Sequence, residues 1–207
     1  MTSSTKIVVL GESGVGKSTL VSTLCKKPVS QHESTVAAAV SIAWHDYRAG
    51  SSEQRAEQIE LWDIGGAAAH RAASVVFMEG VAGVILVHDL SNSKSESNLG
   101  QWLSLVGCTE QRRLAGATLH QSLRSLLADV EASQVPILIV GTKADLAPHR
   151  AKTTSALVGS AAAQLQLDGR RELPAGSSSA MAIARFFDAS IDRLRSPLVE
   201  RRRRVLA

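Results

Sequence analysis

Residues 11–18 read Gly-Glu-Ser-Gly-Val-Gly-Lys-Ser and match the pattern G-x-x-x-x-G-K-[ST]. In front of them, residues 5–10 are apolar and β-branched, which predicts a buried strand that ends at Gly11. Behind them, residues 17–26 predict a helix that Pro28 stops. A strand, a glycine-rich turn and a helix in this order predict a loop whose backbone N–H groups and helix N-terminus face a phosphate chain.

Two side chains of this loop can act on the phosphates. Lys17 supplies a point charge to the outer phosphates, and the Ser18 hydroxyl can ligate Mg²⁺. A tight structural turn is the alternative, but it leaves Lys17 and Ser18 unexplained. The pattern in this context therefore predicts nucleotide binding.

A second motif, Asp63-Ile64-Gly65-Gly66, closes an apolar strand predicted at residues 58–63. This strand is expected to pair with the alternating stretch 40–44 across a turn at 49–52. A carboxylate at the strand end can hold Mg²⁺ through water, and a glycine amide there can meet the terminal phosphate. The motif therefore extends the predicted phosphate site.

A third motif, Thr142-Lys143-Ala144-Asp145, follows the apolar run 135–140. It stands at the carboxyl end of a predicted strand, where ligands bind in open α/β sheets. The Asp145 carboxylate can accept hydrogen bonds from N1–H and the exocyclic N2 of guanine, a pair of donors that adenine lacks. A carboxylate left unmatched makes the wrong base costly, so the motif predicts a preference for guanine.

The rest of the chain predicts one doubly wound α/β domain, because strands alternate with helices. The runs 81–90 and 135–140 are typical of strands buried on both faces of a parallel sheet. The remaining expected elements are helical stretches at 99–106 and 119–130, a short strand at 165–167 and a last helix from about Ser178, its expected N-cap.

Composition supports a compact domain. The 207 residues are 44% hydrophobic and 20% charged, which is enough apolar material for one sizeable core. No stretch approaches the roughly 20 apolar residues of a membrane span, and the N-terminus lacks the pattern of a signal peptide. We therefore expect a cytoplasmic protein.

The charge is uneven along the chain. Residues 1–100 hold 8 Lys+Arg against 10 Asp+Glu, a net of −2, and residues 101–207 hold 15 against 9, a net of +6. The run Arg201–Arg204 can make weak electrostatic contact with an acidic membrane, or it is a solvated helix end. With 3% aromatic residues there is no base-stacking surface, so nucleic acid is not an expected partner. The chain ends without a cysteine motif, so no stable lipid anchor is expected.

These motifs resemble the guanine-nucleotide elements of the Ras superfamily: GESGVGKS, the threonine of Ser34-Thr35-Val36, WDIGG and GTKAD. The stretches IELWDIGG, GVILVHDLSN and LPAGSSSA…RFFD are further similar to the Rab-like protein 3 group of small GTPases. The resemblance implies a P-loop NTPase small G domain, with a mostly parallel six-stranded sheet flanked by helices. The domain would cover residues 1–195 with an extended segment at about 107–134, followed by a basic tail at 196–207.

The resemblance also implies GTP or GDP and Mg²⁺ as ligands, and effector and regulatory proteins as partners of switch I (about 27–40) and switch II (about 64–78). The residues expected at the nucleotide are Ser13, Gly14, Val15, Gly16, Lys17, Ser18, Thr19, Thr35, Gly66, Thr142, Lys143, Ala144, Asp145, Asp168 and Gly169. Ser18, Thr35 and, through water, Asp63 are expected at the metal, and Lys17 and Gly66 are the expected catalytic residues.

The chain departs from the family pattern at three places. Asp168-Gly169 stands for the usual Ser-Ala-Lys loop, with Ser179-Ala180 as the alternative. Ala37 replaces a usual glycine in switch I. Ala67 occupies the position of the water-orienting glutamine, which implies very slow GTP hydrolysis unless His70 or Arg71 substitutes.

Two functions remain open at this point. The first is a switch that presents different surfaces in its GTP and GDP states. The alternative is a constitutively nucleotide-bound scaffold or a homodimeric binding module. An ATPase is disfavoured by Asp145.

Trp44 and Trp62 are expected to be packing residues, with an exposed partner-binding pair as the alternative.

Overall fold

The computed structural model describes residues 4–28, 34–106, 135–151, 162–167, 173–174 and 176–195. The elements in these residues are β1 (Thr5–Leu10), α1 (Lys17–Leu24), β2 (Ala38–Tyr47), β3 (Arg55–Ile64), η1 (Ala68–His70), η2 (Ala72–Met78), β4 (Gly83–Asp89), α2 (Ser93–Ser97), α3 (Leu99–Val106), β5 (Ile137–Thr142), α6 (Pro148–Ala151), β6 (Ala162–Gln166) and α7 (Ser178–Arg195). The predicted helix 119–130, the extended segment 107–134, Asp168-Gly169 and the tail 196–207 lie outside the described residues.

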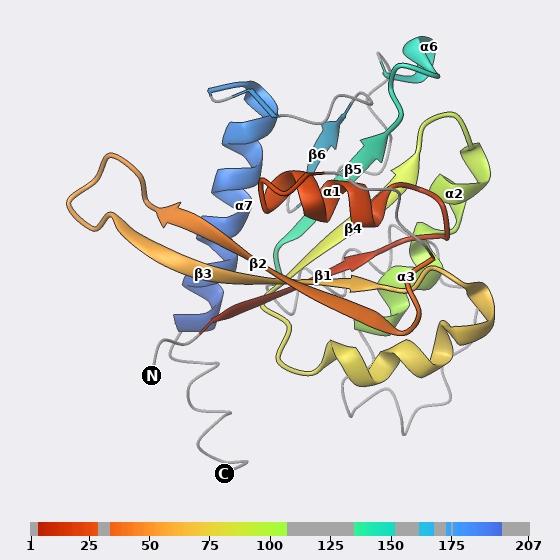
Figure 1. Ribbon diagram of the computed structural model, residues 1–207, viewed down its shortest axis with the longest axis horizontal. Helices are drawn as coiled ribbons and strands as arrows, with labels where there is room; N and C mark the ends of the chain where they lie inside the picture. Colours follow the sequence, from red (N-terminus) through yellow and green to blue (C-terminus); the bar gives the residue numbers. More distant parts are fainter. Residues whose placement is uncertain are drawn as a thin grey trace.

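The sheet contains six strands in the order β2-β3-β1-β4-β5-β6 (Figure 1). β2 runs antiparallel to β3, and the other neighbouring pairs are parallel. The predicted mostly parallel α/β domain is therefore confirmed. The register pairs Val9 with Asp63, and Asp89 with Thr142. The three sequence motifs consequently meet at one edge of the sheet, at the carboxyl ends of β1, β3 and β5.

The core consists of two layers of side chains, one on each face of the sheet. Ile7 and Val9 of β1 belong to the cluster that contains residues of α1 and α7, whereas Val8 and Leu10 belong to the cluster that contains α3. All four side chains are fully buried. This two-sided burial explains why the central strands are continuous apolar runs.

Some element boundaries differ from the prediction. β2 and β3 form a longer ladder than expected, from the pair Ala38–Ile64 to the pair Tyr47–Arg55. β6 begins at Ala162, so the strand predicted at 165–167 was placed too late. Pairing with β5 sets the start of β6, and its first residues, Ala162 and Ala163, are alanines, which strands do not favour.

The N-cap of the last helix was also predicted one residue too late. The Ser177 hydroxyl accepts from the backbone N–H of Ala180 at 3.2 Å, so Ser177 caps α7 and Ser178 is its first residue. Ser179 and Ala180, the alternative guanine loop, lie in the first turn of this helix.

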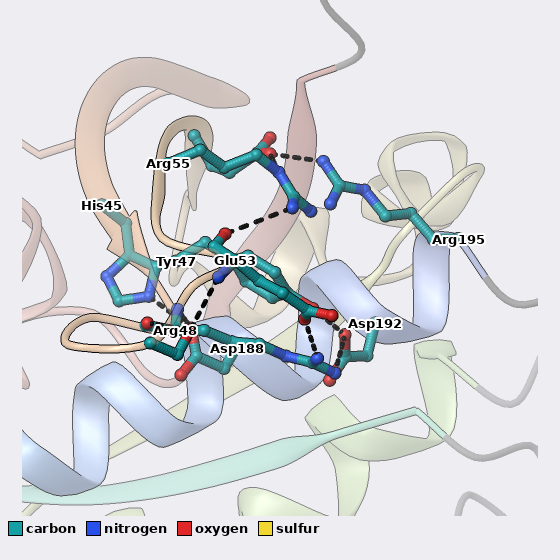
Figure 2. Close-up of polar contacts among 10 residues, drawn as sticks. His45, Tyr47, Arg48, Glu53, Arg55, Asp188, Asp192 and Arg195 are labelled. Carbon is teal, nitrogen blue, oxygen red and sulfur yellow. Dashed lines mark hydrogen bonds and ion pairs between the residues drawn. The ribbon is translucent and has the colours of Figure 1, made fainter.

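The far end of the β2–β3 hairpin is bound to α7 by two carboxylates one helical turn apart (Figure 2). Asp188 Oδ1 accepts from the backbone N–H of Arg48 at 3.1 Å and lies 2.8 Å from His45 Nε2. The Tyr47 hydroxyl donates to Asp192. We call these five residues the hairpin clasp.

Three guanidinium groups surround the ring of Tyr47. Those of Arg48, Arg55 and Arg195 lie 5.1, 4.3 and 5.3 Å from its centroid. Glu57 accepts hydrogen bonds from both Arg55 and Arg195 and so balances their charge. The clasp therefore joins the hairpin to the last turns of α7 through a charged and aromatic layer.

Within the described ranges, every helix falls short of the combination of length and apolar character that a bilayer crossing needs.

Candidate functional site

The phosphate loop connects β1 to α1. Gly16 adopts a left-handed conformation with φ 96°, which only glycine adopts at little cost, and its carbonyl accepts the N–H of Leu20 to begin the helix. Lys17 is 6% exposed, and its ammonium donates to the carbonyls of Gly11 at 2.9 Å and Glu12 at 2.8 Å. Burial lowers the pKa of Lys17, and the charges of Asp63 and Glu12 oppose this shift. The carbonyl groups at the start of the loop therefore fix the position of the Lys17 ammonium.

Three oxygen-bearing side chains converge beside the loop. Ser18 Oγ donates to Asp63 Oδ2 at 2.5 Å, Thr35 Oγ1 donates to the same oxygen at 3.0 Å, and the two hydroxyl groups are 3.2 Å apart. Asp63 is 3% exposed, and its Oδ1 has no hydrogen-bond partner among the described residues.

These donors fit the expected metal. Mg²⁺ prefers oxygen ligands and is held in nucleotide sites by one or two carboxylates together with phosphate oxygens. Ser18 and Thr35 offer hydroxyl oxygens, and the orphaned Oδ1 of Asp63 is a buried acceptor that a water of the metal shell can satisfy. The predicted metal residues are thus brought together.

Switch I and switch II meet at the same place. The N–H of Gly65 donates to the carbonyl of Ala37 at 2.8 Å. A Cβ on Gly66 would lie 2.4 Å from the backbone nitrogen of Ser13, so only glycine allows this approach to the phosphate loop. Ala37 adopts φ 60°, a left-handed conformation that glycine adopts at little cost. Thr35 reaches the metal group although this glycine is absent.

The predicted base-binding end of the site is built on β5. The Thr142 hydroxyl lies 2.6 Å from the carbonyl of Val15 and 3.0 Å from that of His88, and it has one proton to donate. Thr142 therefore ties the end of β5 to the phosphate loop and to β4.

Lys143 spans the phosphate loop and β4. Its ammonium donates to the Gly14 carbonyl at 3.0 Å and to Asp89 Oδ2 at 2.7 Å. Burial would raise the pKa of Asp89, but the hydrogen bonds from Lys143 and Ser91 outweigh it and hold that pKa below its ordinary value. Asp89 thus remains a carboxylate that fixes the ammonium of Lys143 beside the phosphate loop.

The rest of the motif faces outward. The Ala144 N–H donates to the Leu167 carbonyl at 3.1 Å, which fixes the loop to the residue that follows β6. Asp145 is exposed. Asp168 and Gly169, the other predicted residues of this end, lie outside the described residues.

His88 is a buried group next to the Thr142–Asp145 loop, paired in register with Gly141. It is 1% exposed, and neither ring nitrogen has a hydrogen-bond partner among the described residues. Burial lowers the pKa of His88. The residue is therefore held neutral beneath the base-binding loop.

The start of switch II lacks a side chain that can orient water. Residues 67–69 are exposed alanines, and Ala67 precedes η1 in an extended conformation. Arg71 is turned to the phosphate loop, where its Nη2 donates to Glu12 Oε1 at 2.8 Å.

Four residues were missed or misjudged at the sequence level. Asp89 was detectable, because it ends a buried strand as Asp63 does. Glu12 and Trp102, whose indole N–H donates to Glu12 Oε1 at 3.3 Å, gave no sequence signal because their contact joins distant segments. The packing prediction was wrong for Trp44, which is 72% exposed because β2 is the edge strand, whereas the half-buried Trp62 packs on Phe77.

Comparison with known proteins gives a consistent result. The family model described as Ras of Complex, Roc, domain of DAPkinase matches residues 6–118. The chain is 40% identical over 204 residues to Rab-like protein 3 of Xenopus tropicalis, covering 91% of this chain and 85% of that protein. Rab-like protein 3 of Danio rerio is 39% identical over 207 residues, with coverage of 91% and 85%. That of Homo sapiens is 38% identical over 204 residues, with coverage of 91% and 84%.

Proposed function

Because the chain belongs to the small GTPases of the Ras superfamily, in the Rab-like protein 3 group, we propose that it is a guanine-nucleotide-dependent switch. The observation that carries the proposal is the convergence of the phosphate loop, Asp63 and the Thr142–Asp145 loop at one edge of the sheet. Ligands of open α/β folds bind at this edge.

Each group has a role that follows from its position. The loop backbone and Lys17 bind the phosphates, and Gly66 offers an amide to the terminal one. Ser18, Thr35 and Asp63 hold Mg²⁺, which when bound neutralises charge on the phosphate oxygens. Lys143 lies along the base, and Asp145 reads it.

Switching follows from the hydrogen bonds between these groups. In switch I, Thr35 donates to Asp63 and the Ala37 carbonyl accepts the N–H of Gly65 of switch II, so the two switches meet beside the metal group. Contacts to a terminal phosphate would order both segments, and loss of that phosphate would release them.

An exposed apolar surface beside the switches supports partner binding. Val40, Ile42 and Trp44 alternate along β2 and so share one face of it, at 49%, 37% and 72% exposure. Within the switches, Val36 is 85% exposed and Val76 is 69% exposed. Exposed apolar residues that gather on one face mark interaction sites. We propose that effector and regulatory proteins bind here, in the cytoplasm, and that the role lies in vesicle trafficking or signalling.

The nucleotide itself tests the proposal. Purified protein is denatured, and the released nucleotide is identified by ion-exchange chromatography. We expect GDP or GTP at close to one per chain. Adenine nucleotide, or none after purification in Mg²⁺ buffer, would overturn the proposal.

The constitutively nucleotide-bound scaffold, alone or as a homodimer, is the second candidate. It is favoured by Ala67, because positioning and charge stabilisation supply most of the catalysis in phosphoryl transfer, and an intact site alone turns over at only about 10⁻⁴ s⁻¹. Single-turnover GTP hydrolysis separates the two. We expect very slow hydrolysis by the wild type, equal or faster hydrolysis by Ala67→Gln, and no change in His70→Ala.

A further inference from the structure

Glu12, the second residue of the phosphate loop, turns its side chain away from the phosphate-binding side. Its backbone carbonyl accepts from Lys17, but its carboxylate oxygen Oε1 accepts from Arg71 at 2.8 Å and from the indole of Trp102 at 3.3 Å. The phosphate loop is therefore joined by one side chain to switch II and to α3.

Arg71 occupies the junction between η1 and η2. Its guanidinium lies 4.7 Å from the ring centroid of Trp102, and its Nη1 donates to Gln101 Oε1. The side chain of Arg71 is 16% exposed and that of Glu12 is 24% exposed. Trp102 is fully buried in the α3 layer. Each of Glu12, Arg71 and Trp102 thus contacts the other two, and the charged pair is shielded from water on the tryptophan side.

The triangle is close to the point where switch II meets the phosphate loop. Gly66 lies against the backbone of Glu12 and Ser13, where an added Cβ would approach within 2.6 Å of the Glu12 carbonyl oxygen. Only Ala67 and the short η1 separate Gly66 from Arg71. The loop therefore holds both ends of η1, one by backbone packing and the other by the Glu12 carboxylate.

We propose that Glu12, Arg71 and Trp102 form a latch that positions Gly66 at the terminal phosphate. Arg71 is on this account a positioning residue that acts through Gly66, and it is not a charge donor to the phosphate. The latch rests on the proposed function, because it needs a bound nucleotide to act on.

The latch has a selective consequence. Gly66 is expected to contact the terminal phosphate, which GTP has and GDP lacks, so releasing Arg71 should weaken the hold on GTP more than the hold on GDP. A charge-assisted hydrogen bond of this kind corresponds to about a tenfold change in affinity. A group that only stabilised the fold would change both nucleotides equally.

The experiment compares the wild type, Glu12→Gln, Arg71→Ala, Arg71→Lys and the charge exchange Glu12→Arg with Arg71→Glu. Dissociation of a fluorescent GDP and of a fluorescent non-hydrolysable GTP analogue is measured in excess Mg²⁺, beside thermal melting of each variant. Arg48→Ala is the matched control, since Arg48 forms ion pairs with Glu53 and Asp192 of the hairpin and α7.

We expect Glu12→Gln and Arg71→Ala to release the GTP analogue about tenfold faster than the wild type, with GDP release changed less than about threefold. Arg71→Lys and the charge exchange should restore part of the loss, and Arg48→Ala should leave both rates unchanged. Amide exchange across Ala68–Met78 should quicken in the two single variants in either nucleotide state.

Two results would overturn the latch. One is unchanged release of the analogue in Arg71→Ala, and the other is equal acceleration of both nucleotides together with a lowered melting temperature. A wild type that binds no guanine nucleotide would overturn the proposed function itself, and this is established before any variant is compared.

Discussion

Asp145 is the residue on which the proposed base selection depends. Its exposed carboxylate stands at the end of the loop that Lys143 and Ala144 anchor to the phosphate loop and to Leu167. Asp145→Asn replaces one acceptor oxygen with a donor, which opposes the two donors of guanine and suits the 2-oxo group of xanthine. We expect GTP binding to weaken by roughly a hundredfold or more, and XTP binding to strengthen. Asp46→Asn, at an exposed carboxylate of β2, is the control, and ATP competing as well as GTP in the wild type would contradict the prediction.

Ala37 is the residue that carries backbone strain. Its left-handed φ of 60° costs a non-glycine residue about 1–2 kcal/mol, whereas a glycine there loses more unfolded-state entropy. We therefore expect Ala37→Gly to raise the free energy of unfolding by about 0.5–1 kcal/mol in urea titration. The neighbouring Ala38→Gly, in the extended ladder of β2, should lower it by about the same amount. Losses of equal size in both variants would show that Ala37 is unstrained.

At the scale of elements, the strands could be predicted where the sequence itself carries the signal. β1, β4 and β5 are buried on both faces, so each is a mostly apolar run, and in β1 and β5 a motif follows at the end. β6 could not be placed, because its start is set by pairing with β5. The exposure of the β2 row that contains Trp44 was misjudged for a similar reason. An edge strand left open to solvent and a strand covered by other elements can have the same alternating sequence pattern.

The residues of the site likewise divide into those that the sequence could predict and those that it could not. Residues of the phosphate loop and of the Asp63 and Thr142–Asp145 motifs could be predicted, because each motif is contiguous and stands at a strand end. The pairs Glu12–Arg71 and Lys143–Asp89 join segments 59 and 54 residues apart. Contacts of this kind depend on the sheet order, which a reading of local patterns does not supply.

The hairpin clasp is the element-scale contact that is most directly testable. Tyr47 is 3% exposed, and Tyr47→Phe keeps its ring among the three guanidinium groups while it removes the hydroxyl that donates to Asp192. We expect the free energy of unfolding at neutral pH to fall by about 1–2 kcal/mol. Urea titration of wild type and variant measures this difference.

The stability difference between the wild type and Tyr47→Phe should also depend on pH. Burial and the hydrogen bond to Asp192 raise the pKa of Tyr47 above its ordinary value of 10.0. The unfolded chain then loses the hydroxyl proton at lower pH than the folded chain does. The contribution of the Tyr47 hydroxyl to the free energy of unfolding is therefore complete below about pH 10 and declines as the pH rises through the raised pKa. The stability difference between wild type and Tyr47→Phe should therefore shrink above pH 10. A difference that stays constant to pH 11 would show that the hydroxyl is not bound to Asp192.

At the scale of the whole molecule, a bound nucleotide with its Mg²⁺ would connect segments that lie far apart in the sequence. The metal group combines α1, switch I and β3 through Ser18, Thr35 and Asp63, and the orphaned Oδ1 shows that these side chains do not satisfy one another. A ligand that binds only the folded state adds its binding free energy to stability, about 4 kcal/mol at a thousand times its Kd. The nucleotide and Mg²⁺ are thus expected to contribute a large share of the total stability.

Removal of Mg²⁺ tests this expectation. Excess EDTA should accelerate GDP release and lower the melting temperature of the GDP-bound protein by roughly 10 °C. Ser18→Ala should show a smaller EDTA effect, because one metal ligand is already absent. Thr23→Ala on the same helix is the control, since its hydroxyl donates to the Thr19 carbonyl, and it should respond as the wild type does. If EDTA leaves the melting temperature and the GDP release rate of the wild type unchanged, Ser18, Thr35 and Asp63 do not hold a metal, and their convergence is a structural hydrogen-bond cluster.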